Sequence, residues 1–238
     1  MPSVITSGLL FYVTLGIGSA VALIFCIRRA KGFSISNIML KIAASLCFIL
    51  TGVSALICNP GDYLYAGLII FGGVMGMCGD ITLDLKGLHI EFKHPYMLSG
   101  FIFFLIGHLF YQAAVITFAK INLITVVLCI IGCLIFGVLN LLSAKITKYD
   151  FAEYKTIVYI YSVILALTTA LSAVAMFTSN YSPRFIIMTV GGLLFMLSDL
   201  ILSGTYFGKG QDKPIHYFTN HFTYYAAQFL IMSSIIAG

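Results

Sequence analysis

The chain consists almost entirely of apolar runs that are each long enough to cross a lipid bilayer. A transmembrane helix needs about 20 predominantly apolar residues, and lipid offers the backbone no hydrogen-bond partners, so such runs form helices. The short connections between the runs predict one domain over residues 1–238, an all-α membrane bundle of eight transmembrane helices. The predicted helices are roughly Ile5–Ile27, Ile38–Cys58, Tyr63–Leu85, Tyr96–Ala119, Leu123–Leu142, Thr156–Phe177, Phe185–Phe207 and Tyr217–Ile236.

The composition excludes an ordinary soluble protein. Of 238 residues, 61% are hydrophobic and only 9% are charged, whereas soluble domains have about 25% charged residues. The net charge of +5 does not indicate nucleic-acid binding, because the basic residues lie in short segments between the apolar runs. The cysteines show no disulfide or metal-binding spacing, and we interpret them as small buried hydrophobic residues: Cys26, Cys47, Cys58, Cys78, Cys129 and Cys133.

The basic residues predict the orientation of the bundle, because loops rich in Lys and Arg face the cytoplasm. One set of connections contains only Lys120 and Arg184. We therefore expect a multi-pass protein, with both termini on the non-cytoplasmic side, in a bacterial inner (plasma) membrane. The other set contains eleven basic residues, namely Arg28, Arg29, Lys31, Lys41, Lys86, Lys93, Lys145, Lys148, Lys155, Lys209 and Lys213.

Two aspartates interrupt the apolar runs. Asp80 lies in the third run and Asp199 in the seventh. A carboxyl group in lipid costs at least a few kcal/mol, so it is retained where it faces a polar interior, a partner or a water-filled cavity. Two such groups suit general acid and base catalysis. Asp84 lies one turn after Asp80, and we interpret it as a solvated residue at the end of the helix, near Lys86; the alternative is that its charge acts on Asp80 by like-charge repulsion.

Further polar side chains lie in the fourth and eighth runs. His108, Tyr111 and Gln112 belong to the fourth run. In the eighth run, one helical face contains Tyr217, His221, Tyr224 or Tyr225, and Gln228. The alternative for His108 is a hydrogen-bonded packing residue. A place at the membrane interface is the alternative for Tyr224 and Tyr225 and the favoured interpretation for Tyr217.

Small residues in the third run predict a close helix contact. Gly72 and Gly76 form a small-xxx-small pair, which allows a neighbouring backbone to approach. The chain contains no GxSxG, HExxH or paired CxxC motif. A metal site built from His108, His221 and the aspartates is an open alternative without supporting ligand spacing, and we expect no metal and no cofactor.

Four short segments follow one another along the chain: GDITLD (Gly79–Asp84), GHLFY (Gly107–Tyr111), LSDLIL (Leu197–Leu202) and YYAAQ (Tyr224–Gln228). Their order and spacing resemble the signature motifs of the YhhN/TMEM86 family of eight-helix, lysoplasmalogenase-like integral membrane proteins. Asp84 departs from the family pattern, which more usually has an apolar residue at that position.

This resemblance implies the activity of a lysoplasmalogenase, which hydrolyses the vinyl ether of lysoplasmenyl-ethanolamine or -choline to a fatty aldehyde and the glycerophospho-headgroup. It implies that Asp80, His108, Tyr111, Asp199, Tyr225 and Gln228 are site residues. We predict that Asp80, Asp199 and His108 are catalytic. The predicted substrate-binding residues are Tyr111, Tyr224, Tyr225, Gln228 and His221.

The two buried carboxyl groups also fit this chemistry by themselves. Vinyl ether hydrolysis begins with proton transfer to carbon and passes through an oxocarbenium-like cation, and a pair of carboxyl groups supplies the acid and a stabilising anion, as in glycoside hydrolysis. The alternative function is a small proton-coupled transporter or flippase for a lipid or metabolite, because intramembrane carboxylates also mark ion pathways. We expect a lysophospholipid substrate and membrane lipids as partners, and no nucleic acid; the sequence leaves the oligomeric state open.

Overall fold

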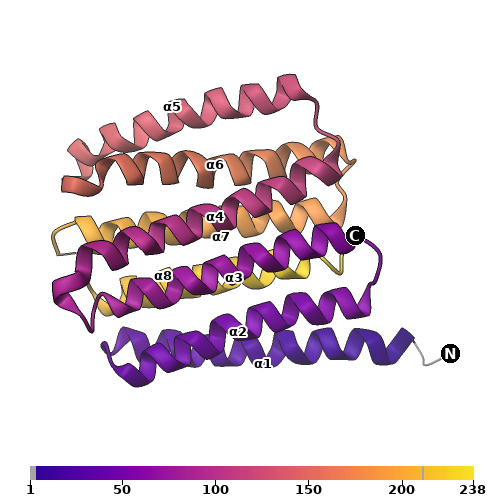
Figure 1. Cartoon of the computed structure of the whole chain (residues 1–238), viewed down its shortest axis with the longest axis horizontal. Helices are drawn as coiled ribbons and strands as arrows, with labels where there is room; N and C mark the ends of the chain where they lie inside the picture. Colours follow the sequence, from indigo (N-terminus) through magenta and orange to yellow (C-terminus); the bar gives the residue numbers. More distant parts are fainter. Residues whose placement is uncertain (1–3, 211) are drawn as a thin grey trace.

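The computed structural model describes residues 4–210 and 212–238. Over these residues the chain forms α-helices that run roughly parallel to one another, with no strand (Figure 1). The all-α membrane bundle that the sequence predicts is confirmed. The helices are α1 (Val4–Ala30), α2 (Ile35–Cys58), α3 (Tyr63–Leu85), α4 (Lys93–Ala119), α5 (Leu123–Thr147), α6 (Lys155–Thr178), α7 (Pro183–Phe207) and α8 (Pro214–Ser233), with short 3-10 helices η1 (Ile90–Phe92) and η2 (Ala152–Tyr154).

Local sequence signals set several of the helix starts. Ser34 caps α2, because its side chain accepts a hydrogen bond from the backbone N–H of Asn37 at 3.2 Å. Asn122 caps α5 through the backbone N–H of Thr125 at 2.9 Å. Proline begins both α7 and α8, where the missing N–H has no helical partner to lose. These signals mark the starts of four of the helices.

The last helix differs from the others in its polarity. In the described chain, α1 to α7 are long and apolar enough to cross a membrane. Helix α8 has 20 residues, about 30 Å at 1.5 Å per residue, which matches the hydrocarbon core of a bilayer. Its polar residues Asn220, His221 and Gln228 are buried inside the bundle. The protein is therefore a multi-pass helical membrane protein whose final helix directs polar groups inward.

Seven helices form a closed ring in the order α1, α2, α3, α4, α6, α7 and α8, and α8 also contacts α2 and α3. Helix α5 lies outside this ring at one edge of the bundle, against α6, while α1 forms the opposite edge (Figure 1). The only α5 residues that are fully buried among those described are Cys133 and Gly137. No disulfide joins any of the six cysteines, all of which lie in the described part of the chain.

Helix α1 begins and helix α8 ends at the same end of the bundle (Figure 1). The opposite end contains the α1–α2, α3–α4, α5–α6 and α7–α8 connections, with the predicted basic residues in them or in the adjoining helix turns. One residue of that set is placed differently. Lys41 lies inside α2 rather than in a connection, and only 4% of it is exposed. We call this end of the molecule the basic end.

The glycines of α3 bring it close to two neighbours. A Cβ atom on Gly72 would lie 2.9 Å from the carbonyl oxygen of Gly107 in α4, and one on Gly107 would lie 2.8 Å from that of Gly72. A Cβ atom on Gly76 would lie 2.7 Å from Nε2 of Gln228 in α8. The predicted close approach at Gly72 and Gly76 is confirmed, and it fixes α3 between α4 and α8.

Candidate functional site

A cavity of about 90 Å³ lies near the basic end of the bundle, and all eight α-helices contribute to its wall. A water molecule needs roughly 10–15 Å³ of such space, so the cavity has room for several waters or part of a ligand. Asp80 and Asp199 both line it. The two carboxyl groups that the sequence singled out therefore face one compartment, although they come from helices on different sides of the ring.

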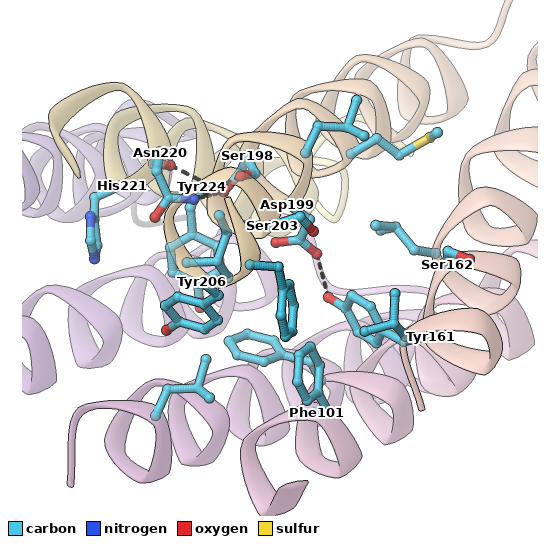
Figure 2. Close-up of a pocket in the computed structure, with 18 of the residues that line it drawn as sticks. Phe101, Tyr161, Ser162, Ser198, Asp199, Ser203, Tyr206, Asn220, His221 and Tyr224 are labelled. Atoms are coloured by element: carbon cyan, nitrogen blue, oxygen red, sulfur yellow. Dashed lines mark hydrogen bonds between the residues drawn. The ribbon is translucent and has the colours of Figure 1, made fainter. Parts of the chain in front are cut away.

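The polarity of the cavity wall changes from one side to the other. The side formed by α1, α2, α3 and α8 contains Arg29, Lys41, Asp80, Asp84 and His221. In the described chain, the side formed by α4, α5, α6 and α7 carries no cation and one charged residue, Asp199, and much of its surface comes from apolar side chains such as Phe101, Phe136 and Phe207. Figure 2 shows Asn220 and His221 on one side of Asp199, and Tyr161 and Ser162 on the other. An elongated ligand with one polar and one apolar end matches this division.

Asp80 is almost completely enclosed by polar partners. Its Oδ2 atom accepts hydrogen bonds from Ser45 Oγ and from the Tyr224 hydroxyl, each at 2.7 Å. Its Oδ1 atom lies 3.3 Å from Lys41 Nζ. Asp80 is 3% exposed, so these partners replace the water that the carboxylate would otherwise bind. A cation and two hydrogen-bond donors favour the charged form of a carboxylate over one without such partners, and they hold it in one orientation.

Lys41 joins two carboxylates. Its Nζ atom lies 3.3 Å from Asp80 Oδ1 and 3.4 Å from Asp84 Oδ1. Asp84 is 7% exposed, which corrects the interpretation of this residue as a solvated group at the helix end. The predicted end of the helix at Leu85 is right, but α2 covers this last turn and brings Lys41 against it. A solitary cation between two buried carboxylates reduces their mutual repulsion.

Asp199 has simpler surroundings. The Tyr161 hydroxyl of α6 donates a hydrogen bond to Asp199 Oδ2, which Figure 2 marks with a dashed line. Asp199 is half-buried and shares the cavity wall with Phe101, Phe104 and Phe207. The described residues give it no salt bridge. The two aspartates thus differ in that Asp80 has a cation beside it and Asp199 has none among the described residues. A neighbouring cation favours the anionic form of a carboxyl group, and its absence favours the acid.

A hydrogen-bonded chain supports Asp80 from the middle of the bundle. The Tyr111 hydroxyl donates to Gln228 Oε1 at 2.9 Å, Gln228 Nε2 donates to the Tyr224 hydroxyl at 3.3 Å, and Tyr224 donates to Asp80. Tyr225 donates to the backbone carbonyl of Lys41 at 3.2 Å. Of these predicted binding residues, Tyr224 lines the cavity, while Tyr111, Tyr225 and Gln228 lie behind its wall. Their contacts orient Asp80 and Lys41.

His108 lies deeper than the cavity. Its Nδ1 atom is 3.2 Å from Thr168 Oγ1, and its ring contacts Phe195 with centroids 4.6 Å apart. Gln112 Nε2 also donates to Thr168 Oγ1, at 3.0 Å. His108 does not line the cavity, so a catalytic role for it stays a prediction, and its contacts in the structure are those of packing and hydrogen bonding.

His221 also lines the cavity, and its Nδ1 atom donates to the Tyr217 carbonyl oxygen at 2.7 Å. Tyr217, for which we favoured a place at the membrane interface, also lines the cavity, and the Arg29 guanidinium lies 5.1 Å from its ring centre. Just beyond the spanning part of α3, burial and the nearby charge of Lys41 lower the pKa of Lys86 to about 7. Lys86 Nζ lies 3.2 Å from the ring centre of Tyr206.

The sequence interpretation missed Lys41, Ser45 and Tyr161. Lys41 and Ser45 are four residues apart on one face of an otherwise apolar run, a pattern that could have identified them. Tyr161 gave no such signal, because tyrosines are frequent in this chain. Among the described residues, no three His, Cys, Asp or Glu side chains lie together as a metal site requires.

The comparisons with known proteins assign the chain to a family. No curated protein and no solved structure matches it. The model of the YhhN family matches residues 36–235. That range begins in the first turns of α2 and ends just after α8, so it includes most of the cavity wall and both aspartates. The chain therefore belongs to the YhhN family.

Proposed function

We propose that this protein is a membrane-embedded hydrolase of the lysoplasmalogenase type. It cleaves the vinyl ether bond of lysoplasmenyl-ethanolamine or -choline and releases a fatty aldehyde and the glycerophospho-headgroup. One observation carries the proposal: Asp80 and Asp199 line the same cavity in contrasting surroundings. The resemblance of the sequence motifs to the family and the match of the chain to the YhhN family model support it.

The surroundings assign different roles to the two carboxyl groups. Asp80, with Lys41 and two hydroxyl donors, serves as the anion. Asp199, which has a tyrosine partner and aromatic neighbours but no cation, serves as the acid. Carboxyl pairs in contrasting environments divide acid and anion roles in this way in other hydrolases. Tyr161 fixes the orientation of the Asp199 carboxyl group toward the cavity.

The reaction then needs only these groups and one water. Asp199 transfers its proton to the vinyl carbon farther from the ether oxygen, and the double-bond electrons form the new C–H bond. The cation that forms at the carbon next to oxygen is stabilised by Asp80. Water adds to that carbon and returns a proton to Asp199. In the resulting hemiacetal, the bond to the glycerol oxygen breaks as the hydroxyl proton passes to that oxygen, which gives the aldehyde and the free alcohol.

Orientation and location are part of the proposal. The difference in basic residues between the two ends of the bundle favours a cytoplasmic basic end and non-cytoplasmic termini. We place the protein in a bacterial inner membrane, where the cavity takes a single-chain lysophospholipid from the surrounding lipid.

Release of fatty aldehyde by the purified protein from lysoplasmenyl-ethanolamine, with a 1-acyl lysolipid as the control substrate, tests the function. Asp80→Asn and Asp199→Asn should each lower kcat by at least about 10²-fold, the usual contribution of a general acid or base. The matched control is Asp212→Asn, which removes an exposed carboxylate at the same end of the bundle and should leave kcat unchanged.

Two results would contradict the mechanism. Near-native turnover in both aspartate variants would remove the two-carboxylate chemistry. Transport of the lipid or of protons by vesicles containing the protein, without aldehyde release, would favour the transporter. A variant that keeps its elution profile and unfolding temperature but loses turnover separates chemistry from folding.

A further inference from the structure

Two buried polar atoms of opposite charge lie in the wall of the cavity without a hydrogen-bond partner among the described residues. They are Nε of Arg29 and Oδ2 of Asp84. Asp84 is 7% exposed and its other oxygen, Oδ1, is occupied by Lys41. A buried charged group that lacks a partner costs about 1–3 kcal/mol or more. Both atoms are therefore available to a molecule in the cavity.

The side chains around these atoms hold them in place. The Arg29 guanidinium carbon lies 5.2 Å from the ring centre of Phe33 and 5.1 Å from that of Tyr217. Lys41 holds Asp84 from the side of Oδ1. Arg29 and Asp84 are also close enough for their charges to interact. The free donor and the free acceptor thus belong to two oriented groups in the polar part of one cavity.

We propose that Arg29 and Asp84 form a subsite for a zwitterionic phosphate ester that carries a primary ammonium group, the chemistry of a phosphoethanolamine headgroup. The Arg29 guanidinium donates hydrogen bonds to the phosphate, for which its planar fork is suited. Asp84 Oδ2 accepts one from the ammonium. A primary ammonium has three N–H donors, whereas a quaternary ammonium has none, so the free carboxylate oxygen selects the former. This inference rests on the proposed lysolipid substrate and names the part that recognises its headgroup.

The division of the cavity agrees with this orientation of the ligand. With the headgroup at Arg29 and Asp84, the hydrocarbon chain runs toward the side without cations, where Phe101, Phe136 and Phe207 line the cavity. Asp199 then lies between the headgroup and the end of the hydrocarbon chain. Figure 2 shows it between His221 of α8 and Tyr161 of α6. In a lysolipid the ether bond lies between headgroup and chain, so the reacting carbon meets the acid.

Binding of non-hydrolysable lipids tests the subsite separately from the chemistry. The probes are saturated 1-O-alkyl lysolipids of one chain length that carry ethanolamine, N-acetylethanolamine, choline or glycerol on the phosphate, titrated against the purified full-length protein. The protein should bind the ethanolamine lipid at least about tenfold more tightly than the other three, the scale of one charge-assisted hydrogen bond. Asp84→Asn should abolish this preference, and Asp212→Asn should retain it.

Arg29→Gln provides the second arm. It should weaken all four lipids by a similar factor, because each carries the phosphate. Equal binding of the four lipids by the unaltered protein would overturn the proposal, and so would an equal loss for all four in Asp84→Asn. The unaltered protein decides the matter even if Asp84→Asn does not fold. A headgroup preference without aldehyde release would refute the proposed hydrolase activity but support the subsite. Aldehyde release without a headgroup preference would support the hydrolase activity but refute the subsite.

Discussion

Lys41 is the residue on which the charge balance of the site depends. It lies between Asp80 and Asp84, and all three side chains are at least nine-tenths buried. Its removal would leave two carboxylates facing each other in a poorly hydrated interior. An ion pair of this kind adds little stability compared with apolar residues, but loss of one partner costs about 3–5 kcal/mol. The cluster therefore specifies one arrangement of α2 and α3.

Lys41→Met should lower the free energy of unfolding by about 3–5 kcal/mol, because it strands two buried negative charges. Adding Asp84→Asn to this variant should recover part of the loss, since only one carboxylate then lacks its cation. The double-mutant cycle, measured by unfolding in detergent, checks this. Strictly additive effects of the two changes would show that Lys41 and Asp84 do not interact.

The pH dependence of stability should reveal Lys86. Burial lowers its pKa in the folded protein to about 7 from its ordinary value of 10.5. Between these values the unfolded chain binds more protons than the folded one, so stability should rise as pH increases from about 7 to about 10. Lys86→Met should remove that part of the rise. Thermal unfolding of both proteins at several pH values measures it, and parallel curves would contradict the assigned pKa.

The sequence identified some residues of the candidate site and misjudged the surroundings of others. Asp80 and Asp199 were identifiable because a carboxyl group inside an apolar run has few explanations. Asp84 and Lys41 were misplaced for one shared reason, since each lies near the end of an apolar run and its environment depends on the neighbouring helix. Tyr161 became visible only when the fold placed it beside Asp199. One-dimensional patterns give the depth of a residue but not its partner.

At the scale of helices, the contact between α3 and α4 depends on two glycines. A Cβ atom on Gly72 would clash with the ring of Tyr111, whose hydroxyl begins the chain of hydrogen bonds that supports Asp80. The hydropathy of the runs predicted where these helices begin and end, with α5 showing the largest difference because it continues to Thr147. Hydropathy carries no information on neighbours, so the ring arrangement and the exclusion of α5 from it came from the structure.

Gly72→Ala should destabilise the protein by about 1–3 kcal/mol, because the added methyl group overpacks the contact. Gly67→Ala is the matched control on the same helix, since no atom lies within 4 Å of a Cβ at that position. Alanine is the better helix former, so this control should be neutral or slightly stabilising. Equal unfolding temperatures for the two variants would contradict the close approach of α3 and α4.

For the whole molecule, the two ends of the bundle should face different compartments. A reporter enzyme that is active only outside the cytoplasm, fused after Gly238, should be active, and the same enzyme inserted after Asp212 should be inactive. The reason is the concentration of basic residues in the connections at the Asp212 end. The reverse pattern would invert the orientation and turn the cavity toward the opposite compartment.

The cavity lies near the basic end, and its wall comes from the helix turns nearest that end. On the proposed function, the protein draws its lipid from one leaflet of the bilayer and returns the headgroup to the solution on the same side. Each turnover then removes one amphiphile of large headgroup and single chain from that leaflet alone. Because the numbers of molecules in the two leaflets set the spontaneous bending of a membrane, the activity of this site is coupled to membrane curvature.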